Sequence, residues 1–539
     1  MRERVGYAIV LLGLLGSSAG LVRGGGQHTA AKPSFQTSDR CLACHNGILT
    51  PSGEDVSIGF AWRSSMMGNS SRDPYWQGSV RRESIDHPES QAAIEDECSV
   101  CHMPITRFES KVEGRKGQIF SHLPFDQDKK ENAKAEDGVS CSVCHQISKD
   151  KLGTPESFNG GFVINPPASK GEHPEYGPFA IDAGRQRIMH TSSAGFRPTE
   201  DAHIRDSALC GTCHTLKTQA LGPGGKEIGS LPEQMPYQEW LHSNYPNRSS
   251  CQSCHMPEIH GQVPITAVLG VPRDGAHRHT FVAANFFMLR MLNLYRKDLS
   301  VAALPTEMTA ASERTVAFLQ SETARVSIPS IELVSGGLQV RVLVQNLSGH
   351  KLPTAYPSRR AWLHVVVRDG KDNKVFESGA LRADGSIEGN DNDEDPARFE
   401  PHYREITKSD QVQIYEPILK DAGGHVTTGL LSAVGYLKDN RLLPSGFKKE
   451  TAEPDIAVVG DASDDPNFTD AGDQVQYSVN TGDAQGPFRV EVELWYQPIG
   501  FRWAHNLNPY KAAEPQRFVG YYDSMASATA VVLARAEGK

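Results

Sequence analysis

The second half of the chain alternates hydrophobic and polar residues with the two-residue period of a β-strand. The segments with this character are residues 338–344, 361–367, 411–418 and 488–496. Successive side chains of a strand point to opposite faces, so segments of this kind bury one face against a partner sheet. We therefore expect residues 326–539 to form an all-β, sandwich-like domain.

Upstream of these strands the hydrophobic residues follow a helical period. In residues 281–296, apolar side chains recur at the three- and four-residue spacing of one helix face. Residues 306–323 are a second helix candidate, with Thr306 as a possible N-cap. We expect a connecting helix over residues 301–325.

Residues 41–255 show neither period over a long stretch and are rich in Gly, Pro, Ser and His. This composition predicts a domain of short helices and irregular loops. At the start of the chain, Arg2 and Arg4 precede an apolar run, residues 5–15, which small residues follow. That order is typical of a secretory signal peptide, which we place at residues 1–26.

This signal predicts a periplasmic or otherwise exported location. The apolar run is too short for a comfortable membrane span, and no second long apolar stretch follows it. We expect no integral membrane span after the signal is removed.

Every cysteine of the chain belongs to one of five copies of the pattern Cys-x-x-Cys-His. The ten cysteines are Cys41, Cys44, Cys98, Cys101, Cys141, Cys144, Cys210, Cys213, Cys251 and Cys254. The histidines that follow them are His45, His102, His145, His214 and His255. This is the attachment pattern of c-type haem, in which two thiols bind the vinyl groups and the histidine binds the iron as proximal ligand. We expect five c-type haems within residues 27–300, where they supply much of the core.

Disulfides and zinc are the alternative uses of these cysteines. An exported chain can form disulfides, but disulfides do not require a histidine after every second cysteine. Zinc sites made from two Cys-x-x-Cys pairs would leave one of the five pairs over. The regular repeat favours haem over both alternatives.

The ligand on the other side of each iron decides whether that haem is closed or open. Twenty histidines minus the five proximal ones leave fifteen, and ten of these precede residue 300, enough for five distal positions. The distal candidates that we favour are His122, His203, His242 and His279.

Residues 60–70 carry a family resemblance, because Trp62 and Ser65 match a W-x-x-S-x-H-A segment. With the five motifs, this segment resembles multihaem cytochromes of the cytochrome c-554-like family over about residues 35–290. The resemblance implies electron transfer through closely packed haems, mostly with two histidine ligands. Met67 stands where that family has a ligating histidine. Met67 is therefore a distal candidate for the first haem, or it packs beside the porphyrin without binding the iron.

Two functions follow from these observations. One is electron transfer between redox partners, and the alternative is an oxidoreductase acting on a small nitrogen or sulfur compound at one open haem. All five motifs are regular, so no altered motif marks a catalytic haem. With 55 basic and 65 acidic residues, the chain is not suited to nucleic acid, and we expect redox protein partners that are basic at the contact.

Residues 346–360 interrupt the strand pattern with a glycine, two prolines and the pair His350-Lys351. This composition predicts a long ordered loop. The loop either docks on the haem domain, with Arg359 and Arg360 pairing to haem propionates, or has a structural role alone. The acidic run at residues 390–395 lacks the pattern of an EF-hand, and we expect a solvated loop there.

Overall fold

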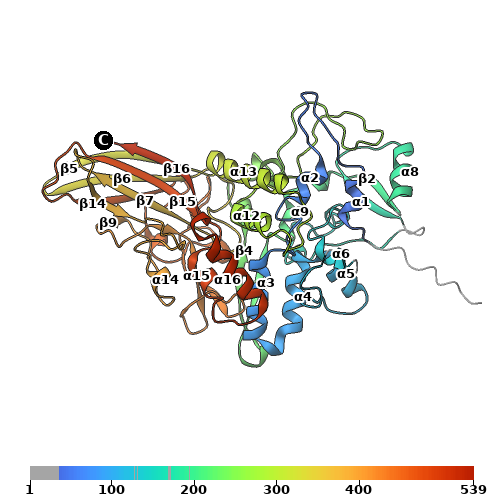
Figure 1. Ribbon diagram of the computed structural model, residues 1–539, viewed down its shortest axis with the longest axis horizontal. Helices are drawn as coiled ribbons and strands as arrows, with labels where there is room; N and C mark the ends of the chain where they lie inside the picture. Colours follow the sequence, from blue (N-terminus) through green and yellow to red (C-terminus); the bar gives the residue numbers. More distant parts are fainter. Residues whose placement is uncertain (1–34, 127, 130–131, 168–171, 194) are drawn as a thin grey trace, which may run out of the picture.

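The computed structural model describes residues 35–539 except 127, 130–131, 168–171 and 194. The predicted signal peptide lies outside the described residues. Figure 1 shows a β-rich half at one end of the molecule and a half of short helices and loops at the other, with helices between them. The coarse division into two differently built parts therefore matches the sequence pattern.

The first half consists of short helices and two small sheets. Its helices are α1 (Ser38–Leu42), α2 (Ile58–Arg63), α3 (Pro74–Asp86), α4 (Gln91–His102), α5 (Pro104–Val112), α6 (Ala133–Glu136), α7 (Cys141–Cys144), α8 (Ala183–Ser192), α9 (Ser207–Gly211), α10 (Pro236–Leu241) and α11 (Cys251–His255). Its strands are β1 (His173–Gly177) parallel to β2 (Phe196–Glu200), and β3 (Leu216–Leu221) antiparallel to β4 (Glu227–Gln234). The longest helix of this half, α3, begins where Asp73 accepts hydrogen bonds from the amides of Tyr75 and Trp76, at 2.9 and 3.2 Å.

Two helices follow this half. Helix α12 (Phe286–Leu294) begins later than the pattern predicts, because the Asn285 side chain caps it by accepting from Met288 N at 3.4 Å. Helix α13 (Pro305–Glu322) has Leu304 rather than Thr306 at the N-cap position. Proline at the first position of α13 fits the helix geometry without needing an amide proton.

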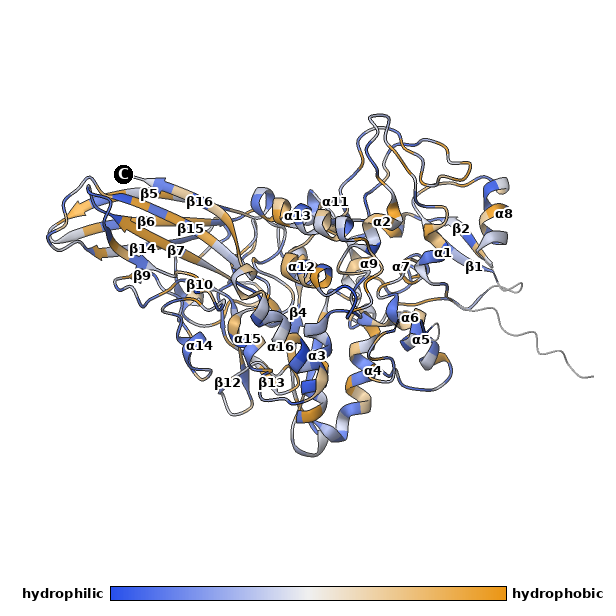
Figure 2. Cartoon of the chain, viewed as in Figure 1, coloured by the Kyte–Doolittle hydropathy of each residue, from blue (hydrophilic) through white to orange (hydrophobic). Residues whose placement is uncertain are grey.

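The second half contains two main sheets. One has the order β10 (Ile414–Tyr415), β7 (Arg360–Arg368), β15 (Arg489–Gln497) and β16 (Val531–Gly538), with β8 (Lys374–Ser378) also paired to β7. The other has the order β5 (Ala324–Val334), β6 (Gly337–Asn346), β14 (Asp473–Asn480) and β9 (Glu405–Ile406). Alternate residues of both sheets, Val342 and Val492 among them, share one buried core. Figure 2 shows the hydrophobic residues along β6, β7, β14 and β15.

This half differs from the predicted all-β domain in two respects. Residues 411–418 form parts of two strands, because β10 ends before β11 (Pro417–Asp421), which joins β12 (Val426–Thr427) and β13 (Ala433–Asp439) in a separate sheet. The chain also adds the helices α14 (Asp391–Glu394), α15 (Phe501–His505) and α16 (Ala513–Ser524).

Helix α16 joins the two halves by packing against α3. The rings of Phe518 and Tyr75 lie 4.9 Å apart, and Arg81 donates two hydrogen bonds of 2.9 Å to the Glu514 carboxylate. The buried core runs from α12 and α13 into both sheets without a break. Within the described part of the chain, no helix is long and apolar enough to cross a membrane.

Candidate haem-binding cavity

All ten cysteines and all five motif histidines line one cavity of about 1750 Å³. A pocket for a single small ligand typically measures about 300–1,000 Å³. The five motifs therefore converge on a space large enough for several ligands, and most of its lining is apolar, as a porphyrin requires.

A turn of helix arranges each motif. The amide of the motif histidine donates to the carbonyl of the first cysteine in three motifs, for example His45 N to Cys41 O at 3.0 Å. The other two motifs lie in α4 and α11. An i to i+4 bond places the first cysteine and the histidine on one face, one turn apart. This is the arrangement that haem attachment needs.

The described cysteines form neither a disulfide nor a compact cluster of metal ligands. All ten thiols are free. Among the described residues, the one group of three side chains close enough to hold a metal contains no cysteine.

Backbone carbonyls fix the orientation of four motif imidazoles. The Nδ1–H groups donate to carbonyl oxygens as follows: His45 to Ile265 (2.6 Å), His102 to Ser70 (2.9 Å), His145 to Tyr176 (2.6 Å) and His255 to Val282 (2.6 Å). Such a bond leaves Nε2 free for a metal. Burial lowers the pKa of all five motif imidazoles, which favours the neutral form that binds iron.

Two of the motif imidazoles face a second, nearly parallel imidazole. The ring centroids of His145 and His279 are 6.3 Å apart with an interplanar angle of 18°, and those of His255 and His350 are 6.2 Å apart with an angle of 8°. Imidazole nitrogen binds a metal at about 2.0 Å, so two imidazoles on opposite sides of one metal ion have centroids about 6 Å apart. Both pairs fit one iron between their rings.

The hydrogen bonds of His279 and His350 agree with that arrangement. His279 Nδ1 lies 3.1 Å from the carbonyl oxygen of His277, and His350 Nδ1 lies 2.9 Å from that of Lys351. Each Nδ1–H donates to its carbonyl, so Nε2 is the free nitrogen in both rings. His279 is one of the four distal candidates from the sequence, whereas His350 comes from the β half.

The structure does not bring the other three histidine candidates to the cavity. His203 Nε2 donates to Ile147 O at 2.8 Å, and its Nδ1 lies 3.0 Å from the Asp201 carboxylate. His242 Nε2 donates to Lys448 O at 3.0 Å, and His122 Nδ1 contacts Asn132 Oδ1 at 3.0 Å. None of the three belongs to the described residues that line the cavity. These candidates were favoured partly for their position along the chain, and distance along a chain does not predict distance in the folded structure.

The sequence reasoning missed His350 because it sought distal ligands before residue 300. A signal was present, since His350 lies in the loop at residues 346–360, for which docking on the haem domain is one of the two predicted roles. His277 also lines the cavity with its Nδ1 bonded to Met256 O at 2.5 Å. Met67 lines the cavity as well, and its backbone oxygen accepts from Val139 N at 3.0 Å.

The loop at residues 346–360 docks on the haem-motif half. Tyr245 OH donates to Leu347 O, and Ser243 OH donates to Gly349 O at 3.3 Å. A Cβ on Gly349 would lie 3.1 Å from the Tyr245 ring, tighter than an ordinary contact, so a larger residue would press on that ring. These contacts hold the loop so that His350 lines the cavity.

A buried ionic network holds the base of the loop. Lys351 Nζ lies 2.8 Å from the Asp439 carboxylate, and Arg441 lies 2.7 Å from the same carboxylate and 2.9 Å from Glu239. Glu239 also accepts from Lys351 N at 3.1 Å. All four side chains are almost fully buried, so the network fixes the loop against the first half.

The neighbouring arginines have different surroundings. Arg360 forms a buried ion pair with Asp393 at 2.7 Å, so it is not free to meet a propionate. Asp393 belongs to the acidic run at residues 390–395, which we expected to be a solvated loop. That expectation is wrong for half of the run, because Asn390, Asn392 and Asp393 are buried, and residues 391–394 form helix α14. Arg359 lines the cavity.

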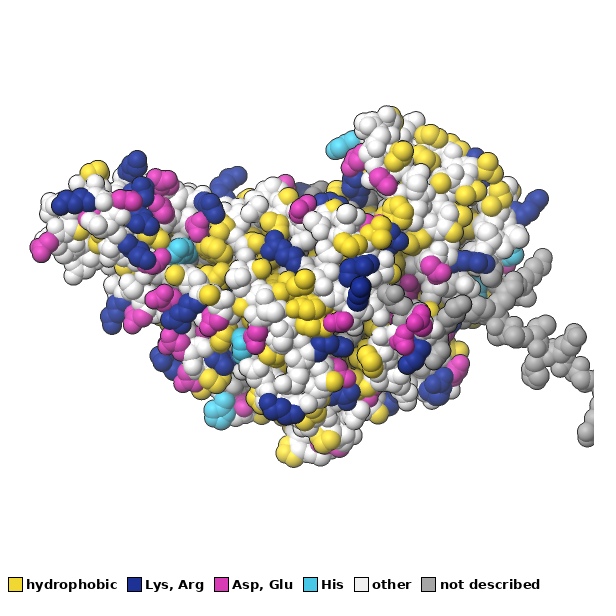
Figure 3. Space-filling view, viewed as in Figure 1, with side chains coloured by type: hydrophobic (Ala, Val, Ile, Leu, Met, Phe, Trp, Pro, Cys, Tyr) yellow, Lys and Arg dark blue, Asp and Glu magenta, His cyan; other side chains and the backbone are white. Residues whose placement is uncertain are grey.

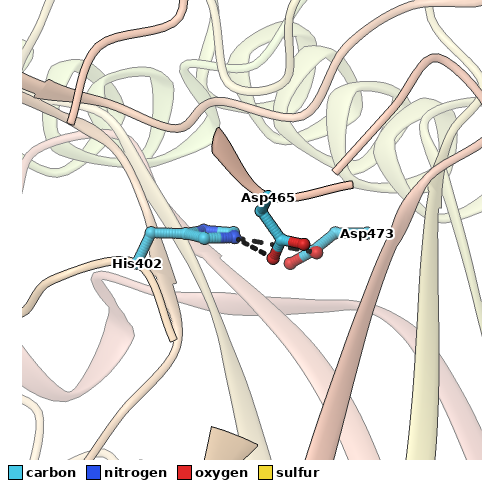
Figure 4. Close-up of side chains that lie close together, drawn as sticks. All are labelled: His402, Asp465 and Asp473. Carbon is cyan, nitrogen blue, oxygen red and sulfur yellow. Dashed lines mark hydrogen bonds and ion pairs between the residues drawn. The ribbon is translucent and has the colours of Figure 1, made fainter. Parts of the chain in front are cut away.

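A second cluster, shown in Figure 4, joins His402, Asp465 and Asp473 inside the β half. His402 Nδ1 accepts from the amide nitrogens of Gln413 and Asn440, at 2.9 and 3.2 Å. The oxygens of these two amides accept backbone N–H groups, which fixes the amide orientation. His402 Nε2 must then carry the proton and donate it to Asp465 at 3.2 Å. The cluster is a hydrogen-bonded network in which His402 has no free nitrogen for a metal.

The face of the molecule drawn in Figure 3 is not dominated by one sign of charge. In Figure 3, acidic and basic side chains are interspersed over both halves of the molecule. Mixed charge of this kind suits weak protein contacts better than nucleic acid.

Comparison with known proteins identifies one solved structure with a similar fold. No protein-family model and no curated protein matches the sequence. The structure is similar to the crystal structure of a penta-heme cytochrome c552 from Thermochromatium tepidum, with a TM-score of 0.51 and 14% sequence identity over 94% of this chain and 99% of that one. The chain therefore has the fold of a pentahaem cytochrome over nearly its whole length.

Proposed function

We propose that this protein is an exported multihaem c-type cytochrome that binds five haems and transfers electrons between redox protein partners. The observation that carries the proposal is the convergence of all five Cys-x-x-Cys-His motifs on one large cavity. The pentahaem composition of the structural neighbour supports the same reading.

Each part of the site has a definite role in this proposal. The ten thiols attach the porphyrins, and the motif imidazoles present Nε2 to the irons because backbone carbonyls hold their Nδ1–H groups. His279 and His350 supply the sixth ligands opposite His145 and His255. A bound c-type haem supplies one-electron chemistry at its iron.

Contacts between motifs indicate the order of the haems. The thiols of Cys41 and Cys141, of Cys101 and Cys213, and of Cys210 and Cys251 are close enough to shift each other's pKa. The first motif is thus next to the third, and the fourth is next to both the second and the fifth. Adjacent attachment points place neighbouring haems close together, as an electron relay requires.

A potentiometric titration of the matured protein tests this function. We expect reversible uptake of five electrons, with potentials low enough to reflect histidine ligation of several haems. A protein that carries its haems but cannot be reduced and reoxidised reversibly would contradict the proposal.

A further inference from the structure

The imidazole of His102 is in face-to-face contact with an indole. The ring centroids of His102 and Trp76 lie 4.3 Å apart, and the two rings are 4° from parallel. The two imidazole pairs described above have centroids 6.3 and 6.2 Å apart, which leaves room for an iron between the rings. At 4.3 Å no such room is left, so Trp76 packs directly on the face of the His102 ring.

This contact leaves the iron-binding nitrogen of His102 free. A ring nitrogen binds a metal in the plane of the imidazole, whereas Trp76 covers the face of that plane. Ser70 O accepts the Nδ1–H bond of His102 at 2.9 Å, and the Ser70 hydroxyl donates to His102 O at 3.1 Å. Nε2 is therefore left for the iron, while Ser70 holds the edge of the imidazole and Trp76 holds its face.

Trp76 is itself held by the first turn of α3 and by a hydrophobic cluster. Its amide donates to the Asp73 carboxylate at 3.2 Å. Its side chain and that of Cys98 pack against one cluster. The buried members of this cluster are Val80, Ile94, Met103, Ile119, Phe125, Ala135 and Leu431. Helices α3 and α4 pack against each other (Figure 1), so α3 brings the indole to the motif in α4.

The stacked indole distinguishes His102 from the other motif imidazoles. Among the described residues, the other aromatic side chain near a motif imidazole is Phe318, which is tilted by 53° from His255 at 6.1 Å. The face of an indole carries negative potential and attracts positive charge. An imidazole bound to ferric iron shares the positive charge of the metal, and that charge decreases on reduction. An indole on its face therefore stabilises the oxidised haem more than the reduced haem.

We propose that Trp76 is a positioning residue that fixes the His102 imidazole beneath the second haem and lowers the potential of that haem. The inference rests on the proposed function, because it requires a haem at Cys98 and Cys101 with His102 as its proximal ligand. The five motifs supply the same two thiols and the same imidazole to every haem. The stacked indole gives one of the five haems a property that its motif alone does not supply.

The test is a potentiometric titration of the matured five-haem protein, together with proton NMR of its oxidised form. Trp76→Leu keeps an apolar side chain but removes the ring, and we expect it to shift one of the five redox equilibria about threefold to tenfold toward the reduced form. A tenfold shift corresponds to about 59 mV for a one-electron couple. The hyperfine-shifted methyl signals of one haem should also move, because they depend on the orientation of the bound imidazole.

Trp76→Phe keeps an aromatic ring and should recover most of both changes. Ile119→Val is the matched control, since Ile119 belongs to the cluster that supports Trp76 but is not among the residues that line the cavity. This control loosens the packing without removing the stacked ring, so all five potentials should stay unchanged. Trp76→Met, which also lacks a ring, replaces Trp76→Leu if the latter does not mature with five haems.

Three results would overturn the proposal. The first is a ring-free variant with five haems whose redox curve and methyl signals superimpose on those of the parent. The second is a shift toward the oxidised form. The third is an equal shift in Trp76→Leu and Trp76→Phe, or in Ile119→Val, which would show that packing alone sets the potential. All three leave the electron-transfer proposal intact, which fails separately if the parent lacks its haems or cannot be reduced and reoxidised.

Discussion

The imidazole rings of His255 and His350 lie 8° from parallel with their centroids 6.2 Å apart, although 95 positions separate them along the chain (350 − 255 = 95). One belongs to a haem motif and the other to a loop of the β half. Opposed imidazoles at this spacing fit one iron between them, so we propose that the β half supplies a ligand to one haem.

Removal of His350 should open one haem. We predict that His350→Ala leaves the iron beside His255 without its sixth ligand, so that about one haem in five becomes high-spin and binds carbon monoxide after reduction. Ferric EPR and the carbon monoxide difference spectrum measure this change. His279→Ala should give the same change at the third motif, whereas His203→Ala is the control, because both nitrogens of His203 contact protein groups. An unchanged spectrum in His350→Ala would remove His350 from the ligand set.

The ionic network beneath the loop should contribute strongly to stability. In Asp439→Asn, Lys351 and Arg441 would lose the carboxylate that they share. Breaking a buried pair by removing one partner costs about 3–5 kcal/mol. Urea unfolding of the five-haem protein measures the loss. Glu113→Gln, which removes the exposed pair with Arg115, should cost less than about 1 kcal/mol. Equal small effects of the two substitutions would contradict the assignment.

The buried carboxyl of Asp473 should make stability depend on pH. Burial raises its pKa from 3.8 to about 7. A raised pKa means that the stabilising contribution is complete below pH 3.8 and is lost as the pH rises through about 7. For this shift the loss is on the order of 4 kcal/mol.

Asp473→Asn should abolish that loss, because the amide oxygen can still accept from Tyr415 OH, which lies 2.7 Å from Asp473 Oδ2. Denaturant midpoints at pH 5 and pH 8 should therefore differ more in the parent than in the variant. The same pH dependence in both proteins would show that Asp473 does not titrate in this range.

Met67 is the remaining ligand proposal from the sequence. If its sulfur binds the first haem, Met67→His should lower one midpoint potential and leave four nearly unchanged, because thioether ligation raises the potential of a haem. Redox titrations of the two proteins decide the matter. Curves that superimpose would make Met67 a packing residue.

The sequence was informative where a local pattern determines local structure. The two-residue alternation around Val342 predicts β6, and the five motifs predict one haem region because their chemistry is local. The Arg360–Asp393 pair and the His255–His350 pair join residues far apart in the chain. The spacing of hydrophobic and polar residues cannot predict contacts of this kind. Helix α16 was missed for a related reason, since its amphipathic face packs on α3 of the other half. The boundary expected at residue 326 falls two residues into β5, within a core that both halves share.

Intact-mass analysis of the exported, matured protein tests the central claim most directly. We predict a mass that exceeds the polypeptide by five covalently attached haems, and by four when Cys251 and Cys254 are both replaced by serine. Fewer than five additions on the matured parent, or an unchanged number in the double variant, would contradict the account.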